Sequence, residues 1–267
     1  MILSPCFSQE NEIERLSYRS NMLGIGSASV YDTYLSPSDY SGISFSFMQE
    51  NMKMTGMMNG NIAAQQLFNI SFLNTENKAE TSREYAGFIE YNYGLFYRLA
   101  PLPNLKVFAG SQINGLVGCI YNTRNSNNPV SAKAHLNLTL SGIAAYNFNI
   151  KSQPFRLRYQ ISSPFVGVMF ATHYGQSYYE ISLGVDDDLV YFSSFHNQLS
   201  LRNTLSLEIP LSFMTLRLAY RNTMYETKVN NLNTRIHDNS FMIGFSREFL
   251  SFSGKKQLKR NYNRVFE

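Results

Sequence analysis

Hydrophobic and polar residues alternate along much of the chain, with the two-residue period of a β-strand that has one apolar and one polar face. The clearest stretch is 198–209, where leucine or isoleucine occupies nearly every odd position and polar residues occupy the even ones. The same pattern recurs in the second half of the sequence at 135–148, 155–162, 214–221 and 240–249. The sequence therefore predicts five amphipathic strands in this half.

Five further strands are predicted in the first half, near 16–31, 41–52, 60–74, 85–99 and 104–121. The first of them is the weakest, because Gly24, Gly26 and Ala28 dilute the alternation. Ten strands are an even number, as in bacterial single-chain membrane barrels. The predicted fold is all-β: a single antiparallel up-and-down transmembrane β-barrel of about ten strands.

The connections between these strands are predicted to alternate in length, as in barrels with short periplasmic turns and long extracellular loops. The connections expected at the periplasmic side are short and carry proline, at 100–103, 151–154 and 210–212. The others are longer and rich in Asn, Ser and Thr, at 75–84, 122–132, 164–197 and 230–239. These longer segments should be extracellular loops.

The segment 164–197 leaves the strand count open between ten and twelve. Residues 178–183 alternate in polarity and could form a further membrane strand. We prefer a long, partly β-structured loop, because Pro164 and the acidic run Asp186–Asp188 suit a loop better than a lipid-facing strand.

Composition supports a membrane barrel. Charged residues make up 16% of the 267 residues, which is well below the roughly 25% of soluble domains. The chain has no apolar run of about 18 residues, so a helical membrane protein is excluded. A β-barrel accommodates both observations, because only alternate residues of each strand face lipid.

Cysteine content and net charge argue against disulfide-rich, zinc-binding and nucleic-acid-binding proteins. The chain has 2 cysteines, too few for a disulfide scaffold or a cysteine-based zinc site. The formal net charge is only +4, and Lys255, Lys256, Lys259 and Arg260 near the end supply as much. Nucleic acid is therefore not an expected partner.

The sequence suggests three regions. Residues 1–8 are predicted to be a residual signal peptide cut after Ser8, with a lipidated Cys6 and an ordinary disordered N-terminus as alternatives. Residues 9–252 form the predicted barrel. Residues 253–267 form a basic tail that we expect to be solvated in the periplasm.

Charged residues on the polar faces of the predicted strands point into the barrel. A ten-stranded barrel is only slightly wider than the eight-stranded one that side chains just fill. We therefore expect cross-strand ion pairs that plug the lumen, rather than an anion-selective pore. The predicted lumen charge network comprises Glu90, Arg98, Lys106, Arg156, Arg158, Arg202, Glu208, Arg217, Arg221 and Glu248, with Glu50 as a further acidic partner.

The sequence predicts no catalytic, cofactor-binding or metal-binding residue. His237 and Ser240 loosely resemble the His-x-Ser-Asn arrangement of barrel phospholipases, but a spacing of three places them on opposite sides of a strand. His173 and His196 fall in or beside the long outer loop, and His135 on the interior face. The run Asp186–Asp188 could bind calcium, although a charged loop tip is the preferred interpretation.

Tyrosines near the strand ends are expected to form interfacial girdles. This set comprises Tyr18, Tyr31, Tyr85, Tyr97, Tyr121, Tyr146, Tyr220 and Tyr225.

Short motifs add a family resemblance. The segments Gly24–Gly26, Asp32–Pro37 and Tyr40–Gly42, with a last strand ending in Gly244–Phe249, resemble uncharacterised outer-membrane β-barrel proteins of the Bacteroidota over about residues 16–252. The resemblance implies an outer-membrane location in a Gram-negative bacterium and transfers no active site.

We therefore expect a non-enzymatic structural or accessory barrel, in contact with outer-membrane lipid and with other envelope proteins as a subunit of a complex. A barrel hydrolase and a narrow channel are the alternatives. No cofactor is expected.

Overall fold

The computed structural model describes residues 14–184, 188–250, 262–263 and 266. The expected signal peptide at 1–8, two residues of the acidic run (Asp186 and Asp187) and most of the tail at 253–267 lie outside the described residues.

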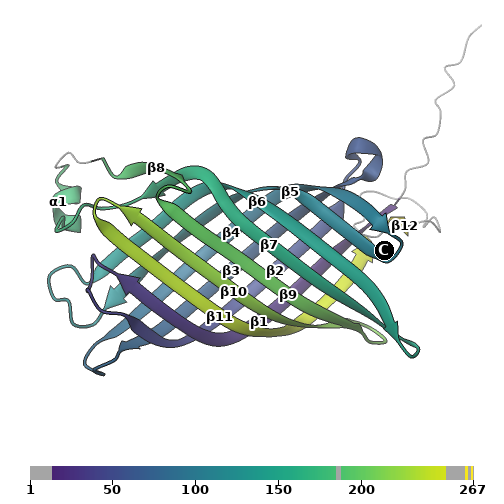
Figure 1. Cartoon of the computed structure of the whole chain (residues 1–267), viewed down its shortest axis with the longest axis horizontal. Helices are drawn as coiled ribbons and strands as arrows, with labels where there is room; N and C mark the ends of the chain where they lie inside the picture. The colour runs from purple at the N-terminus through teal and green to yellow at the C-terminus, as the bar shows by residue number, and fades with distance from the viewer. Residues whose placement is uncertain (1–13, 185–187, 251–261, 264–265, 267) are drawn as a thin grey trace, which may run out of the picture.

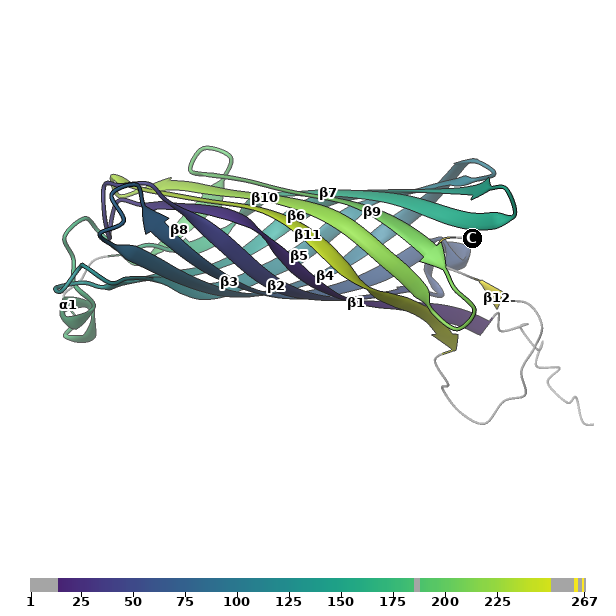
Figure 2. The ribbon, with the colours of Figure 1, turned by 90° about the horizontal axis from the view of Figure 1, so that it is seen from below.

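Ten long antiparallel strands form the wall of a closed barrel (Figures 1 and 2). They are β1 (Glu14–Asp32), β2 (Tyr40–Met54), β3 (Ile62–Asn77), β4 (Arg83–Leu102), β5 (Leu105–Asn122), β6 (Val130–Ile150), β7 (Gln153–Phe170), β9 (Gln198–Pro210), β10 (Thr215–Val229) and β11 (Leu232–Leu250). The sheet closes where β11 pairs with β1, from Leu16 opposite Leu250 to Asp32 opposite Thr234. Each strand pairs with its sequence neighbours in the wall, so the predicted up-and-down barrel is confirmed.

Short elements decorate the two ends of the barrel. The loop end carries β8 (Val190–Ser194) and α1 (Tyr178–Ser182), at the left of Figure 1. The opposite end, which we call the turn end, carries η1 (Met57–Gly60) and β12 (Tyr262–Asn263). No helix in the described part of the chain is long and apolar enough to cross a membrane.

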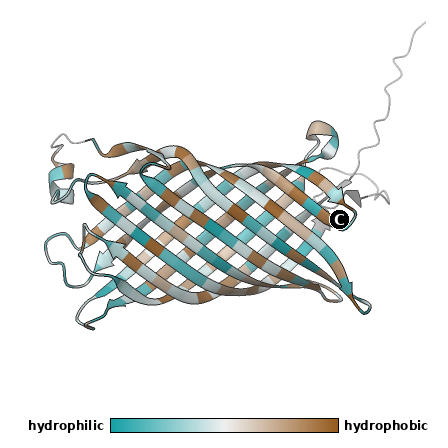
Figure 3. Cartoon of the chain, in the orientation of Figure 1, coloured by the Kyte–Doolittle hydropathy of each residue, from teal (hydrophilic) through white to brown (hydrophobic). Residues whose placement is uncertain are grey.

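The two faces of each strand differ as the alternation predicts, and Figure 3 shows this change of hydropathy from residue to residue. In β6, Leu138 points outward and is 38% exposed, whereas its neighbour Asn137 points inward and is 2% exposed. The outward side chains are apolar because they contact lipid. The inward side chains are polar because they form hydrogen bonds and ion pairs with one another across the narrow lumen.

Interior glycines let neighbouring strands approach closely. A Cβ atom at Gly26 would lie 2.0 Å from the carbonyl oxygen of Asn239, and one at Gly42 would lie 2.0 Å from that of Asn74. The glycines that weaken the alternation in β1 are therefore sites where the wall of the barrel leaves no room for a side chain.

Several strands extend beyond the predicted ends. The predicted loop 230–239 is wrong: Asn230 and Asn231, with φ of 54° and 61°, make a tight turn between β10 and β11. Two positive φ values are typical of the type I′ turn that joins twisted hairpins. The apolar-outward pattern is lost in this part of β11 because its outward residues are the polar Asn233, Arg235 and His237, whereas the inward Leu232 and Ile236 are buried and apolar.

The segment 164–197 also differs from its prediction in detail. Pro164 lies within β7, which continues to Phe170, at a register shift opposite Leu138 and Thr139. Residues 178–182 form the helix α1 rather than a membrane strand. The short β8 pairs with the end of β7 and adds no further crossing, so the wall keeps the preferred number of strands.

Candidate functional site: the barrel lumen

A buried carboxylate at the centre of the lumen binds two arginines. Glu50 from β2 accepts hydrogen bonds from Arg158 of β7 and from Arg217 of β10, where the Nη1 to Oε2 distances are 2.9 and 2.7 Å. The three residues are only 1%, 1% and 2% exposed. Because a buried charge needs both a partner and hydrogen bonds, this group forms a compact cross-lumen ion cluster.

A second carboxylate lies beside this cluster. Glu208 of β9 accepts a hydrogen bond of 2.5 Å from the Tyr18 hydroxyl and one of 3.2 Å from Arg156 Nη1. Arg217 Nε lies 3.7 Å from Glu208 Oε1 and so connects the two acids. We call Tyr18, Glu50, Arg158, Glu208 and Arg217 the Glu50 cluster.

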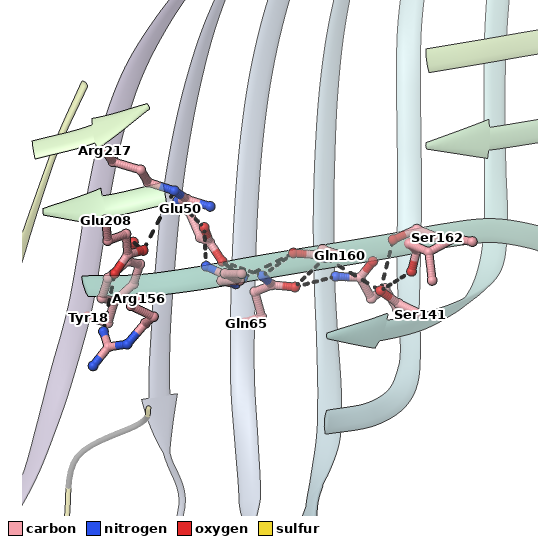
Figure 4. A network of polar contacts seen from close by, with 12 residues as sticks. Tyr18, Glu50, Gln65, Ser141, Arg156, Gln160, Ser162, Glu208 and Arg217 are labelled. Carbon is pink, nitrogen blue, oxygen red and sulfur yellow. Dashed lines mark hydrogen bonds and ion pairs between the residues drawn. The ribbon is translucent and has the colours of Figure 1, made fainter. Parts of the chain in front are cut away.

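Amides and hydroxyls extend the Glu50 cluster across the rest of the lumen (Figure 4). Gln65 Nε2 donates to Glu50 at 2.5 Å and to Gln160 Oε1 at 3.2 Å. Gln160 in turn reaches Ser141, whose hydroxyl lies 2.8 Å from that of Ser162. Side chains from β2, β3, β6, β7 and β10 therefore join in one hydrogen-bonded network inside the barrel.

An aromatic side chain from the end of the chain covers the turn side of the Glu50 cluster. Phe266 is fully buried; its ring lies edge-on to Tyr18 at 5.2 Å and to Phe108 at 5.7 Å. The Arg158 guanidinium lies 4.8 Å from the ring centroid, within cation–π range. Asn147 Nδ2 donates to the Phe266 carbonyl at 2.9 Å.

At Phe266, these contacts correct the expectation of a solvated tail. Tyr262–Asn263 pairs in parallel with β1, and Phe266 occupies the turn end of the lumen.

On the loop side of the Glu50 cluster, two further acid–arginine pairs face each other. Arg202 contacts Glu90, which also accepts from Asn114 Nδ2 at 2.6 Å. Arg221 Nη2 lies 3.4 Å from Asp238 Oδ2. Between them lies a cavity of about 80 Å³.

The loop end of the lumen is covered by buried apolar side chains and an ion pair. Lys133 Nζ lies 2.8 Å from Asp32 Oδ2. The apolar residues that pack there are Ala28, Val30, Leu35, Tyr40, Leu73, Ala86, Phe88, Ile120 and Ile236.

The long loop that carries α1 is attached to this end by two tyrosines. The Tyr34 hydroxyl donates to the Gln176 carbonyl at 2.7 Å, and the Ala132 backbone N–H donates to the Tyr178 hydroxyl at 2.6 Å. Burial raises the pKa of Tyr34 to about 12. Ser177 caps the N-terminus of helix α1, and its hydrogen bonds lower the pKa of Glu180.

The remaining predicted network residues lie nearer the turn end. Arg156 Nη1 is 3.9 Å from Glu248 Oε1. Arg98 and Lys106 occupy interior positions of β4 and β5, both half-buried, outside the Glu50 cluster.

The histidines are dispersed. His135 lies inside, stacked on Tyr225 with ring centroids 5.6 Å apart. His237 points outward to Glu226, with Nε2 to Oε1 at 2.8 Å, while Ser240 points inward to Asp238. A His237–Ser240 pair is therefore absent, as the spacing predicted.

The other two histidines lie in the long loop. His173 Nε2 is 2.9 Å from the Tyr191 hydroxyl, and His196 Nδ1 is 2.5 Å from Ser194 Oγ. Among the described residues, no hydrogen bond or ion pair joins a carboxylate to His196.

Two tyrosines predicted for the interfacial girdle lie inside the barrel instead. Tyr18 is 1% exposed, and Tyr225 packs on His135. Both occupy polar-face positions in their strands, and this parity was the available signal against the girdle. The alternation did not indicate that Gln65 and Asp238 would bind the lumen charges. Gln65 is uncharged, and Asp238 lies in the segment 230–239 that was predicted to be a loop.

The described residues hold no group of three or more His, Cys, Asp or Glu side chains that could bind a metal ion. The lumen is instead a set of acid–arginine pairs. Its chemistry is that of charge neutralisation and hydrogen bonding.

Comparisons with solved structures show the fold. The transport unit of the autotransporter AIDA-I from Escherichia coli matches with a TM-score of 0.51 and 8% identity, over 94% of this chain and 93% of that one. The translocator domain of autotransporter NalP from Neisseria meningitidis matches at 0.40 with 8% identity, over 90% of each chain. The COG4313 outer membrane channel from Pseudomonas putida F1 matches at 0.38 with 8% identity, over 93% and 100%. The match to the AIDA-I transport unit, with a TM-score of 0.51, shows that the chain has the fold of an outer-membrane β-barrel.

Sequence comparisons are sparser. No curated protein matches the chain. A protein-family model described as "Protein of unknown function (DUF3316)" matches residues 1–256.

Proposed function

Because the chain belongs to the DUF3316 family, whose function is unknown, we propose a role from the geometry of the lumen. The protein is a non-enzymatic structural or accessory barrel in the outer membrane of a Gram-negative bacterium. Its lumen is closed to solute flow, and its loop end contacts other envelope proteins.

The observation that carries this proposal is the Glu50 cluster. A channel needs a continuous wet path, whereas Glu50, Arg158 and Arg217 join three separate strands across the barrel axis and are almost completely buried. Opening this layer would leave charges without partners in a poorly hydrated interior, which is costly. The barrel is therefore suited to a static role.

The ordered loop end supports contact with a partner. Tyr34 and Tyr178 hold the long loop against neighbouring loops, so this end presents a defined surface. Exposed apolar side chains in the loop, Tyr174 at 75% and Tyr179 at 71%, are of the kind enriched at protein interfaces.

An experiment with two matched epitope insertions tests the location and orientation. One epitope replaces part of the loop-end connection 123–129, and the other part of the turn-end connection 211–214. We expect the protein in the outer-membrane fraction, with the first epitope labelled on intact cells and the second only after permeabilisation. Recovery in another fraction, or labelling of both epitopes on intact cells, would contradict the proposal.

The accessory role has its own test. Replacing residues 173–184 by a Gly–Ser linker should leave the barrel in the membrane but reduce the envelope proteins that co-purify with it after cross-linking on cells. An unchanged set of cross-linked proteins would count against a loop-end partner.

A hydrolase is the second candidate, and the contact between Ser194 and His196 is the observation that favours testing it. The hydroxyl-to-imidazole distance of 2.5 Å has the geometry of a nucleophile beside a base. Both residues lie in the exposed part of the long loop, with no described carboxylate to orient the imidazole.

A further inference from the structure

The wall of the barrel is interrupted between β7 and β9. Pairing of β7 with β9 ends at Ser162 opposite Arg202, and pairing of β7 with β8 begins only at Val166 opposite Ser194. Residues 163–165 have no ladder partner on this edge in the described part of the chain, and one of them, Pro164, has no N–H to donate. We call this interruption the β7–β9 gap.

The other side of the gap is the beginning of β9. Residues 198–201 pair with β10 but not with β7. A side-chain hydrogen bond of 2.8 Å from Ser163 Oγ to the Ser200 carbonyl spans the gap. A flexible side-chain bond thus replaces part of the backbone ladder that seals the wall elsewhere.

The cavity on the loop side of the Glu50 cluster reaches this gap. Its lining includes Arg202 and Arg221, which point inward, together with Pro164 and Ser200 at the gap. It also includes Leu201, which points outward and is next to Arg202 in β9. The cavity therefore reaches the backbone of β9 beside the gap.

Several buried polar atoms in the cavity lining have no hydrogen-bond partner. Three belong to side chains that are almost completely buried: Thr139 Oγ1, Gln198 Nε2 and Arg221 Nε. Two of these atoms are N–H donors and the third is a hydroxyl that can donate. Glu90 and Asp238 already bind arginines. The three unpartnered groups can therefore donate hydrogen bonds to an oxygen atom of a ligand.

Outside the barrel, an apolar groove of about 770 Å³ leads to the same gap. Small residues form its floor, among them Ala109, Ser111 and Gly142. Large apolar residues line it, including Leu95, Leu140 and Ile161. Ser162 and Leu201 line both the groove and the inner cavity, so the two spaces lie on opposite sides of the wall at the β7–β9 gap.

We propose that the cavity, the gap and the groove together bind a single-chain lipid with an acidic head group, a fatty acid. The carboxylate accepts hydrogen bonds from Thr139, Gln198 and Arg221 in the cavity. The alkyl chain passes through the gap and lies in the groove, facing the membrane. The Glu50 cluster closes the cavity on the turn side, so the site holds its ligand rather than passing it across the membrane.

Size and position favour this occupant. The cavity of about 80 Å³ has room for roughly six water-sized groups, which suits a carboxylate with its first carbons but not the head group of a two-chain phospholipid. The groove faces the region that lipid occupies in a membrane barrel. A soluble polar molecule would make no use of it.

Two outward-facing glycines provide a matched test of the groove. Gly142 lies in its floor, with Ile161 Cγ2 3.8 Å from the position of an added Cβ, and Gly87 lies outside it with nothing within 4 Å. A Cβ atom therefore fits at either position. Tritiated palmitate would be titrated onto the full chain in phosphatidylcholine nanodiscs, with the heat-modifiable gel shift as the check on folding.

We expect saturable palmitate binding, weakened about tenfold or more by Gly142→Leu and unchanged by Gly87→Leu. Equal weakening by the two substitutions would overturn the proposal. So would the absence of saturable binding to the wild-type protein.

A second pair of variants tests the head-group site and does not depend on the groove. Thr139→Val removes an unpartnered hydroxyl in the cavity, and Ser206→Ala removes one elsewhere in the lumen. Palmitate affinity should fall about fivefold in the first and stay unchanged in the second.

Methyl palmitate should compete less well than palmitate, and acetate should not compete. Unchanged affinity in Thr139→Val, or equal competition by methyl palmitate, would contradict binding of the carboxylate in the cavity.

Discussion

At the scale of single residues, the molecule is organised by a small number of buried charges. Glu50 has two arginine partners, so its loss would leave Arg158 and Arg217 with too little negative charge around them. Surface pairs such as Arg83 with Glu76 have no such consequence, because water screens them.

The first prediction compares the buried ion pairs of Glu50 with the surface ion pair of Glu76. Glu50→Gln should lower the free energy of unfolding by about 3 to 5 kcal/mol, the cost of breaking a buried ion pair from one side. Glu76→Gln, the control, should change it by about 1 kcal/mol or less. Urea unfolding in phosphatidylcholine vesicles measures both. Equal effects of the two substitutions would show that Glu50 is not buried among the arginines.

The second prediction concerns the Ser194–His196 contact. For a non-enzymatic barrel, the wild-type protein should hydrolyse acyl esters and peptides no faster than a heat-unfolded sample, and Ser194→Ala and His196→Ala should leave that background unchanged. A wild-type activity that either substitution lowers by about a hundredfold, as expected for loss of a nucleophile or base, would establish the hydrolase instead.

At the scale of strands and turns, the alternation along each strand decides which side chains face lipid. A charged residue placed on the lipid-facing side tests this assignment through the free energy of unfolding. Leu138→Arg places a cation on the outward face of β6, between residues that also face lipid, and should lower the free energy of unfolding by about 2 to 4 kcal/mol. Leu102→Arg at the turn end of β4 should cost about 1 kcal/mol or less, because the side chain reaches water. Similar values from vesicle unfolding would mean that the outward face of β6 is not in the membrane.

A prediction for the β10–β11 turn rests on its backbone. Asn231 has a φ of 61°, which a β-branched residue tolerates poorly. Asn231→Val should destabilise the protein by about 1 to 2 kcal/mol, whereas Asn231→Gly should be nearly neutral. Thermal unfolding in detergent would measure the pair, and a neutral valine would indicate a looser turn than the structure shows.

Alternation in the sequence was sufficient to predict the strands of the wall and the inward direction of Glu50, Arg158 and Arg217. It was insufficient at 230–239, because the outward residues there are polar and two inward residues, Leu232 and Ile236, are apolar, which reverses the pattern of the membrane-spanning strands. It was also insufficient to find the β7–β9 gap. That gap depends on which backbone atoms pair across strands, and a pattern along one strand contains no such information.

The tail shows a different limit. Phe266 lies in a short basic stretch that resembles a solvated end, yet its ring packs between Tyr18, Phe108 and Arg158. A single aromatic residue has no periodicity, so only the three-dimensional structure reveals where it lies.

At the scale of the whole molecule, three layers of side chains block the lumen at different positions along the barrel axis. Phe266 lies at the turn end, the Glu50 cluster follows, and the apolar residues around Tyr40 and Phe88 close the loop end. The cavity between the last two layers lies beside the β7–β9 gap, and the groove lies at the same gap on the outer face of the wall. A closed axis is the central claim, since it separates a structural or lipid-binding barrel from a channel.

Ion conductance across a planar bilayer tests this claim most directly. The purified wild-type protein should show no steady conductance steps. Reproducible open channels in the wild-type protein, above all with a preference for anions, would contradict the closed lumen.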